Sequence, residues 1–123
     1  MSNRADVLEE NLYTLFREDV ECPSVDLAKP IGENSALTGY RFLELLETLY
    51  VVRHLDLEAR SLKDRDEGYY TIASSGHEVN AAVAAALRPT DPAFLHYRSG
   101  GFFVERARQV PGQTPIFDIL LSL

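Results

Sequence analysis

A long run of apolar residues at helical spacing, between Thr38 and Asp64, is the sequence feature that most restricts how this chain can fold. Its members recur every three or four residues, with three more at its edges: Phe42, Leu45, Leu49, Val52, Leu55, Ala59 and Leu62, then Leu46, Tyr50 and Leu57. This spacing places all of them on one broad face of a helix. A face this broad needs other elements packed against it, so we predict a helix over 38–64 in a mostly α domain, with Gly68 as its C-terminal cap.

The composition agrees with one globular domain and excludes several classes of protein. Of the 123 residues, 46% are hydrophobic and 25% are charged, as in folded soluble domains. The net charge of -7 gives no electrostatic drive for general binding to nucleic acids or anionic membranes. The single cysteine, Cys22, excludes an intramolecular disulfide and a cysteine-rich zinc site. The acidic start of the chain is unlike a signal peptide, so we expect a cytoplasmic protein that binds neither nucleic acid nor membrane.

Residues 1–37 are predicted to lead into this domain rather than to belong to its core. Apolar residues at helical spacing indicate a short amphipathic helix over 6–17. The residues that follow are rich in acids, proline and glycine, which is typical of an extended arm.

Three more helices are expected after the long one. Ser75 and Glu78 have the spacing of a capping box, which predicts a helix from Gly76 to Arg88. Its many alanines predict close packing against a neighbouring element. A further helix is expected from Phe102 to Arg108, and a last one after Thr114-Pro115. Because this last helix stays apolar to the end without a stop signal, we expect the chain to be the front part of a longer polypeptide.

Tyr97, Arg98 and the glycines that follow form the most suggestive group for binding. An arginine can hold a diphosphate at two points, a tyrosine adds a hydroxyl, and Gly100-Gly101 would let the backbone come close to a ligand. A surface arginine beside a half-buried tyrosine in a turn would have the same sequence, so the group by itself leaves both interpretations open. The histidines, His54, His77 and His96, show no metal-site or nucleophile spacing.

The order of several features resembles the alpha subunit of the thiamine-diphosphate-dependent decarboxylating component of 2-oxo acid dehydrogenase complexes. The resemblance extends from about Thr38 to Leu123, and the segments that carry it are Arg53-His54-Leu55-Asp56, Tyr69 to Glu78, the alanine-rich helix, Arg88-Pro89-Thr90-Asp91, and Phe94 to Gly101. Gly76-His77-Glu78 is similar to the family's glycine, glutamine or histidine, glutamate signature. Tyr97-Arg98, with Gly101 after it, is similar to the family's cofactor pair. The histidine at position 77 resembles the branched-chain type.

This resemblance implies a fold and a site. Residues 38–123 would form the N-terminal helical part of an α/β thiamine-diphosphate-binding fold, mostly α as it stands. Arg98 would hold the cofactor's diphosphate, and Tyr97 would contact the diphosphate and aminopyrimidine. Tyr70 would line the 2-oxo acid pocket, where the family usually has phenylalanine. The family's magnesium motif, Gly-Asp-Gly followed downstream by asparagine, is not in this chain, so the chain alone is expected to be inactive.

The resemblance also implies partners: the remainder of the alpha subunit, a beta subunit and a lipoyl acyltransferase, in an oligomer. The reaction would be oxidative decarboxylation of a 2-oxo acid with acyl transfer to lipoyl groups. The residues alone favour a different interpretation, a small acidic helical module that docks a partner protein through the apolar face of residues 116–123. With the resemblance taken into account, we favour the dehydrogenase interpretation over the docking module.

Overall fold

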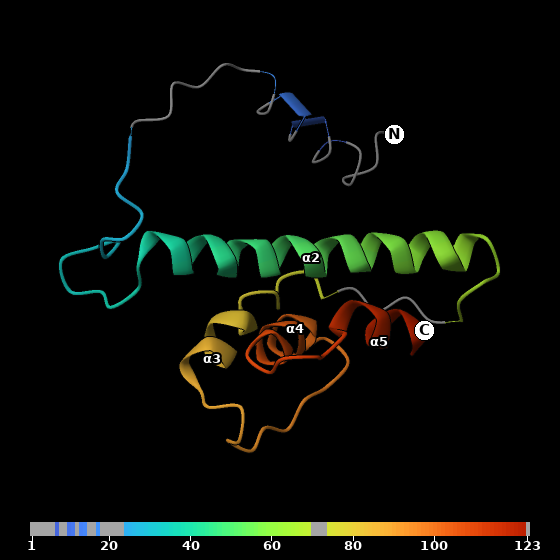
Figure 1. Cartoon of the computed structure of the whole chain (residues 1–123). Coiled ribbons are helices and arrows are strands. Elements are labelled where there is room, and N and C mark those ends of the chain that lie inside the picture. Colours follow the sequence, from blue (N-terminus) through green and yellow to red (C-terminus); the bar gives the residue numbers. More distant parts are fainter. Residues whose placement is uncertain are drawn as a thin grey trace.

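The structure is a computed structural model, and it describes residues 24–69 and 74–122 together with six residues nearer the N-terminus: Val7, Glu10, Asn11, Tyr13, Thr14 and Arg17. Within the described ranges lie the helices α2 (Gly39–Asp64), α3 (Asn80–Ala86), α4 (Gly100–Arg108) and α5 (Pro115–Leu121). Figure 1 shows α2 as a long rod with the three short helices gathered on one side of it. The described part of the chain holds no strand, only an isolated bridge between Pro30 and Thr38. The prediction of a mostly α structure is therefore confirmed.

Both ends of α2 have side-chain or backbone caps. Thr38 is the N-cap, and its hydroxyl accepts the Arg41 N–H at 3.3 Å. At the other end Asp66 adopts a left-handed conformation with φ 58°, and the Glu67 N–H donates to the carbonyl of Leu62 at 2.8 Å. This is the hydrogen bond of a Schellman cap. The expectation that Gly68 provides the cap was wrong, because aspartate also tolerates this conformation and the chain leaves the helix earlier.

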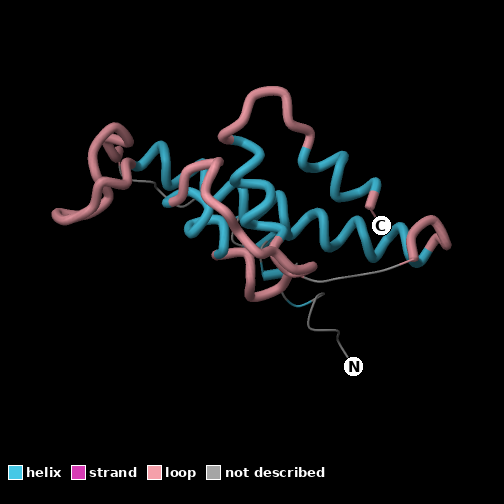
Figure 2. Tube along the Cα trace, turned by 90° about the horizontal axis from the view of Figure 1, so that it is seen from below, coloured by secondary structure: helices cyan, strands magenta, loops and turns pink. Residues whose placement is uncertain are grey.

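The core forms where α2 meets α4 and α5. Val52 and Leu55 of α2 are buried against Val104 of α4, and Ile119 and Leu120 of α5 pack onto them. Figure 2, at right angles to the first view, again places α5 beside the C-terminal half of α2. A single small core therefore holds three helices together.

Only part of the predicted apolar face of α2 is buried. Val52, Leu55 and Ala59 are buried as expected, whereas Phe42 at the N-terminal end is 46% exposed. Two polar residues, Thr48 and Asp56, are buried on this helix as well. The buried face therefore includes polar positions that hydrophobic periodicity does not reveal.

Small residues bring α3 and α4 into close contact, as the alanine-rich sequence predicted. Ala81 and Ala84 are buried in this contact. Gly101 lies so close to the segment before α3 that a Cβ atom there would be 2.4 Å from the carbonyl oxygen of Glu78. Only glycine fits at this position without a shift of the backbone.

The predicted start of α3 was wrong. The helix begins at Asn80, its N-cap Val79 makes no side-chain cap, and residues 75–79 form turns. Gly76 has φ 84°, which no right-handed helix accommodates. The two residues of the expected capping box bond elsewhere: the Ser75 hydroxyl accepts from Arg53 at 2.6 Å, and the Glu78 carboxylate accepts the Gly76 N–H at 2.6 Å.

The last two helices lie where the sequence placed them. α4 begins two residues before the predicted Phe102, and α5 follows Thr114 with Pro115 in its first turn. None of the helices within the described ranges is long and apolar enough to cross a bilayer. The described residues of the predicted helix over 6–17 are helical. Most of residues 1–23 and residues 70–73 fall outside the description.

Candidate functional site

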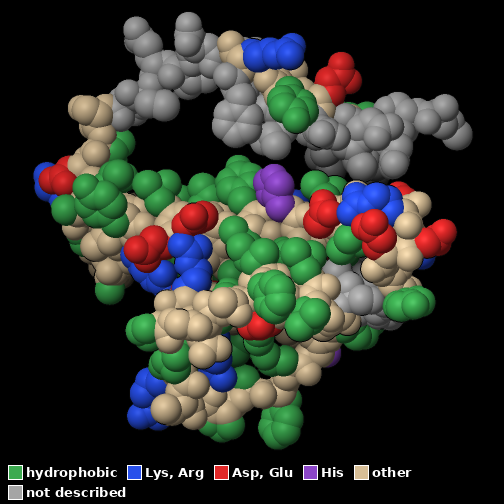
Figure 3. All heavy atoms as spheres, turned by 45° about the vertical axis from the view of Figure 1, so that its right-hand side comes forward, with side chains coloured by type: hydrophobic (Ala, Val, Ile, Leu, Met, Phe, Trp, Pro, Cys, Tyr) green, Lys and Arg blue, Asp and Glu red, His purple; other side chains and the backbone are tan. Residues whose placement is uncertain are grey.

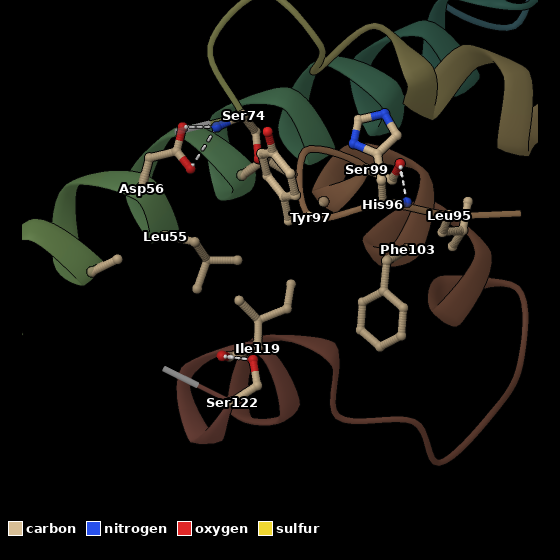
Figure 4. Close-up of a pocket in the computed structure, with 13 residues that line it drawn as sticks. Leu55, Asp56, Ser74, Leu95, His96, Tyr97, Ser99, Phe103, Ile119 and Ser122 are labelled. Atoms are coloured by element: carbon tan, nitrogen blue, oxygen red, sulfur yellow. Dashed lines mark hydrogen bonds between the residues drawn. The ribbon is translucent and has the colours of Figure 1, made fainter. Parts of the chain in front are cut away.

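A cavity of about 290 Å³ lies between α2, α4 and α5 and the loop that precedes α4. Figure 4 shows polar groups from α2, from the loops and, at Ser122, from the end of α5, with apolar side chains such as Leu55, Phe103 and Ile119 between them. It is lined by Val52, Leu55, Asp56, Ala59, Ser74, Leu95, His96, Tyr97, Ser99, Gly100, Phe103, Ile119 and Ser122. Apolar walls with a few polar groups are typical of small-molecule sites.

Asp56 is the buried acid of this cavity. Both of its carboxylate oxygens accept the backbone N–H of Ser74, at 3.0 and 2.8 Å, and the guanidinium of Arg53 is 3.9 Å away. Burial raises the pKa of Asp56, and the Ser74 hydrogen bonds and the charge of Arg53 partly oppose this. Together with the bond from Arg53 to Ser75, these contacts tie the segment 74–79 to α2.

The loop before α4 turns sharply at the predicted cofactor pair. The Ser99 N–H donates to the carbonyl of His96 at 2.8 Å, and the His96 N–H donates to the Ser99 hydroxyl at 3.2 Å. The Arg98 N–H donates to Nδ1 of the His96 ring at 3.1 Å. Three hydrogen bonds within four residues therefore fix the turn that presents Tyr97 and Arg98.

The structure brings the two predicted motifs together. The ring of His77, in Gly76-His77-Glu78, meets the ring of His96 edge to face with centroids 5.8 Å apart. The His96 ring contacts Tyr97 at 5.6 Å, and the guanidinium of Arg98 lies over the Tyr97 ring, 5.3 Å from its centroid. Tyr97 lines the cavity, and half-buried Arg98 lies beside it outside the cavity wall.

Other predicted site residues have different outcomes. Tyr70 lies outside the described residues. Of the two glycines expected to let a ligand approach, Gly100 lines the cavity. Gly101 does not line it and packs against the Glu78 backbone instead. His54 does not line the cavity, and its Nδ1 lies 2.8 Å from the carbonyl of Tyr50.

Sequence analysis missed a polar network between α2 and α4. Glu105 is completely buried, and its carboxylate accepts from Arg41 and, at 3.0 Å, from the Thr48 hydroxyl. Arg108 donates to the same hydroxyl at 3.1 Å and to Glu47 at 2.5 Å. A glutamate among arginines in a short helix looks like a solvent-facing residue, so no local pattern indicated this burial. None of the residues of this network lines the cavity, and its hydrogen bonds join the two helices.

No metal centre is present in the ranges that the structure describes, since nowhere in them do three histidine, cysteine, aspartate or glutamate side chains come together. Comparison of the chain with protein-family models, with curated proteins and with solved structures finds no match.

Proposed function

We propose that this chain is the N-terminal helical part of the alpha subunit of a thiamine-diphosphate-dependent 2-oxo acid dehydrogenase, and that it supplies the diphosphate-anchoring pair Tyr97 and Arg98. The observation that carries the proposal is the contact between the two motifs of the resemblance. His77, from the first motif, lies against His96, which directly precedes the second. Two separate short motifs that merely occurred by coincidence would have no reason to meet beside one cavity.

The residues present fit one part of thiamine diphosphate well. Arg98 offers a planar cation for the diphosphate, and Tyr97 lines the cavity while remaining 60% exposed. The apolar walls suit an aromatic ring system. The carboxylate of Asp56 repels anions from the interior, so the diphosphate belongs outside, beside Arg98, and the ring end belongs toward the cavity.

Bound thiamine diphosphate would supply the chemistry, a thiazolium carbanion that attacks the 2-oxo carbon and allows carbon dioxide to leave. In this proposal the chain's own residues bind and orient the cofactor. Tyr70 contributes to the 2-oxo acid pocket, of the branched-chain type. The magnesium ligands come from the remainder of the alpha subunit, and the beta subunit and the lipoyl acyltransferase complete a cytoplasmic oligomer.

Ligand titration followed by NMR on the chain tests the anchoring role. Thiamine diphosphate with magnesium and inorganic diphosphate should both shift the amide signals of Tyr97 and Arg98, because both carry the anion that Arg98 recognises. Thiamine, which has the same rings without phosphate, should shift them at least tenfold less at equal concentration, since one charge-assisted hydrogen bond contributes about 1.5 to 3 kcal/mol. Equal shifts with thiamine, or none with either diphosphate, would refute diphosphate anchoring.

A second function, a protein-docking module, has its own supporting observation. None of the residues of α5 is buried, and Ile116, Phe117 and Leu121 are 49%, 63% and 74% exposed. Figure 3 shows hydrophobic side chains lying between charged ones on the side of the molecule that it presents. A chain that binds no diphosphate compound in the titration, but whose α5 signals broaden as its own concentration rises, would favour this function.

A further inference from the structure

The turn that presents Arg98 depends on one nitrogen of one histidine. Nδ1 of His96 accepts the Arg98 N–H at 3.1 Å. This bond requires an Nδ1 without a proton, that is, the neutral ring protonated at Nε2. His96 is exposed, so a proton from solvent can reach Nδ1. Once protonated, both ring nitrogens are donors and the bond to Arg98 is lost.

His54 provides the opposite case in the same chain. Its Nδ1 faces the carbonyl of Tyr50 at 2.8 Å, and a carbonyl only accepts, so this nitrogen donates. Protonation of His54 leaves that bond in place. His54 and His96 therefore differ in what a proton does to the neighbouring backbone.

Several charged and titratable groups lie near His96. Its own loop contributes Tyr97 and Arg98, and the segment 74–79 contributes His77, whose ring touches it, and Glu78. From α2, Asp56 lines the same cavity, whereas α4 and α5 line it with uncharged residues only. A proton on His96 therefore adds a positive charge next to the guanidinium of Arg98 at the same moment as it removes the acceptor.

We propose that His96 is a positioning residue, whose neutral ring holds the backbone of Arg98 in the conformation that presents Tyr97 and Arg98, and whose protonation releases it. The consequence for cofactor binding rests on the proposed function, whereas the release of the turn does not. Histidine changes charge between about pH 5 and 8. The turn should therefore be held at the upper end of this range and released at the lower end.

Two variants separate the acceptor from the ring. In His96→Asn the amide oxygen can accept the N–H two residues later, as asparagine does in turns, and it does not titrate. In His96→Phe the ring keeps its place against His77 and Tyr97, but no acceptor remains. Because His96 is exposed, neither change removes core packing.

The first measurement follows amide signals of the isotope-labelled chain by NMR from pH 8 to pH 5. In the wild type the Arg98 amide should shift with the same midpoint as the His96 ring. Its hydrogen exchange, corrected for the intrinsic pH dependence, should accelerate about two- to tenfold, the effect of one lost hydrogen bond. The same amide should stay protected across the range in His96→Asn and unprotected in His96→Phe. An Arg98 amide that ignores pH in the wild type, or keeps wild-type protection in His96→Phe, would overturn the inference.

The second measurement is the binding of thiamine diphosphate with magnesium at pH 8. His96→Phe should bind about two- to tenfold more weakly than the wild type, and His96→Asn should restore binding. If the wild type binds and His96→Phe binds equally well, the positioning role is wrong. If no protein binds the cofactor, the proposed function fails, and the exchange of the Arg98 amide still decides whether His96 controls the turn.

Discussion

Glu105 is a single buried carboxylate of α4 that bonds to two residues of α2. Arg41 bonds to this fully buried acid and also to Glu44, at 2.8 Å, on the surface. Glu105→Ala should lower the free energy of unfolding by about 1.5 to 3 kcal/mol, because it leaves Arg41 and Thr48 without their buried acceptor. Chemical denaturation measures this loss.

Glu44→Ala is the matched control, since it removes the exposed partner of the same arginine. Exposed ion pairs contribute about 0.2 to 1 kcal/mol, so this variant should remain close to the wild type. Equal losses in both variants would mean that burial of Glu105 contributes nothing to the stability of the helix pair.

Asp56 should make stability depend on pH. Because burial raises its pKa above the ordinary 3.8, the folded state takes up this proton more readily than the unfolded state. The contribution is complete below pH 3.8 and is lost as the pH rises through the raised pKa. The wild type should therefore gain stability relative to Asp56→Asn as the pH falls from 7 toward about 4. Denaturation of both proteins at each pH checks this, and a difference that stays constant or shrinks toward acid would contradict it.

Some single residues could be assigned a role from the sequence and others could not. Tyr97 and Arg98 could be selected from the sequence because arginine beside tyrosine has recognisable binding chemistry. Asp56 and Glu105 could not be assigned their roles, because an acid on an amphipathic helix is ordinarily solvent-facing and their partners, Ser74 and Arg41, are distant in the sequence. The bond from Arg98 to His96 is local, but its existence depends on a ring orientation that the sequence does not specify.

At the level of elements, the contact between α3 and α4 depends on Gly101. Gly101→Ala should destabilise the fold by about 1 to 3 kcal/mol, because the new Cβ meets the Glu78 carbonyl and the backbone must shift. Gly32→Ala is the control: nothing lies within 4 Å of its added Cβ, and such a change is expected to be neutral or slightly stabilising. Thermal unfolding compares them, and a Gly101→Ala protein as stable as Gly32→Ala would show that the helices can move apart freely.

The helices themselves were more predictable than their junctions. The extent of α2 follows from its apolar period and from Thr38, and the start of α5 follows from Thr114-Pro115. The predicted start of α3 was wrong because the Ser75 hydroxyl accepts a hydrogen bond from Arg53 instead of capping the helix. Tertiary contacts of this kind override a local capping pattern. Hydrophobic periodicity likewise places the apolar face of α2 but not the buried Thr48 and Asp56 on it.

At the level of the whole molecule, the proposed function predicts that the chain alone does not turn over substrate. The magnesium motif of the family is not in its sequence, and the proposed role of Tyr97 and Arg98 is to anchor the cofactor rather than to complete a reaction site. With thiamine diphosphate, magnesium and a branched-chain 2-oxo acid, release of carbon dioxide should equal that of the protein-free control. Sustained turnover by this chain would show that it is a complete enzyme of another kind.

The most direct test of the anchoring role is the affinity of Arg98→Lys for thiamine diphosphate with magnesium, measured by calorimetric titration. Lysine keeps the positive charge but lacks the two-point planar grip, so affinity should fall by a factor of roughly 10 to 150, equivalent to 1.5 to 3 kcal/mol. Arg65→Lys is the control, because Arg65 pairs with Glu58 and Glu67 at the far end of α2, and it should bind like the wild type. If Arg98→Lys and Arg65→Lys bind the cofactor equally well, Arg98 does not anchor a diphosphate and the account is contradicted.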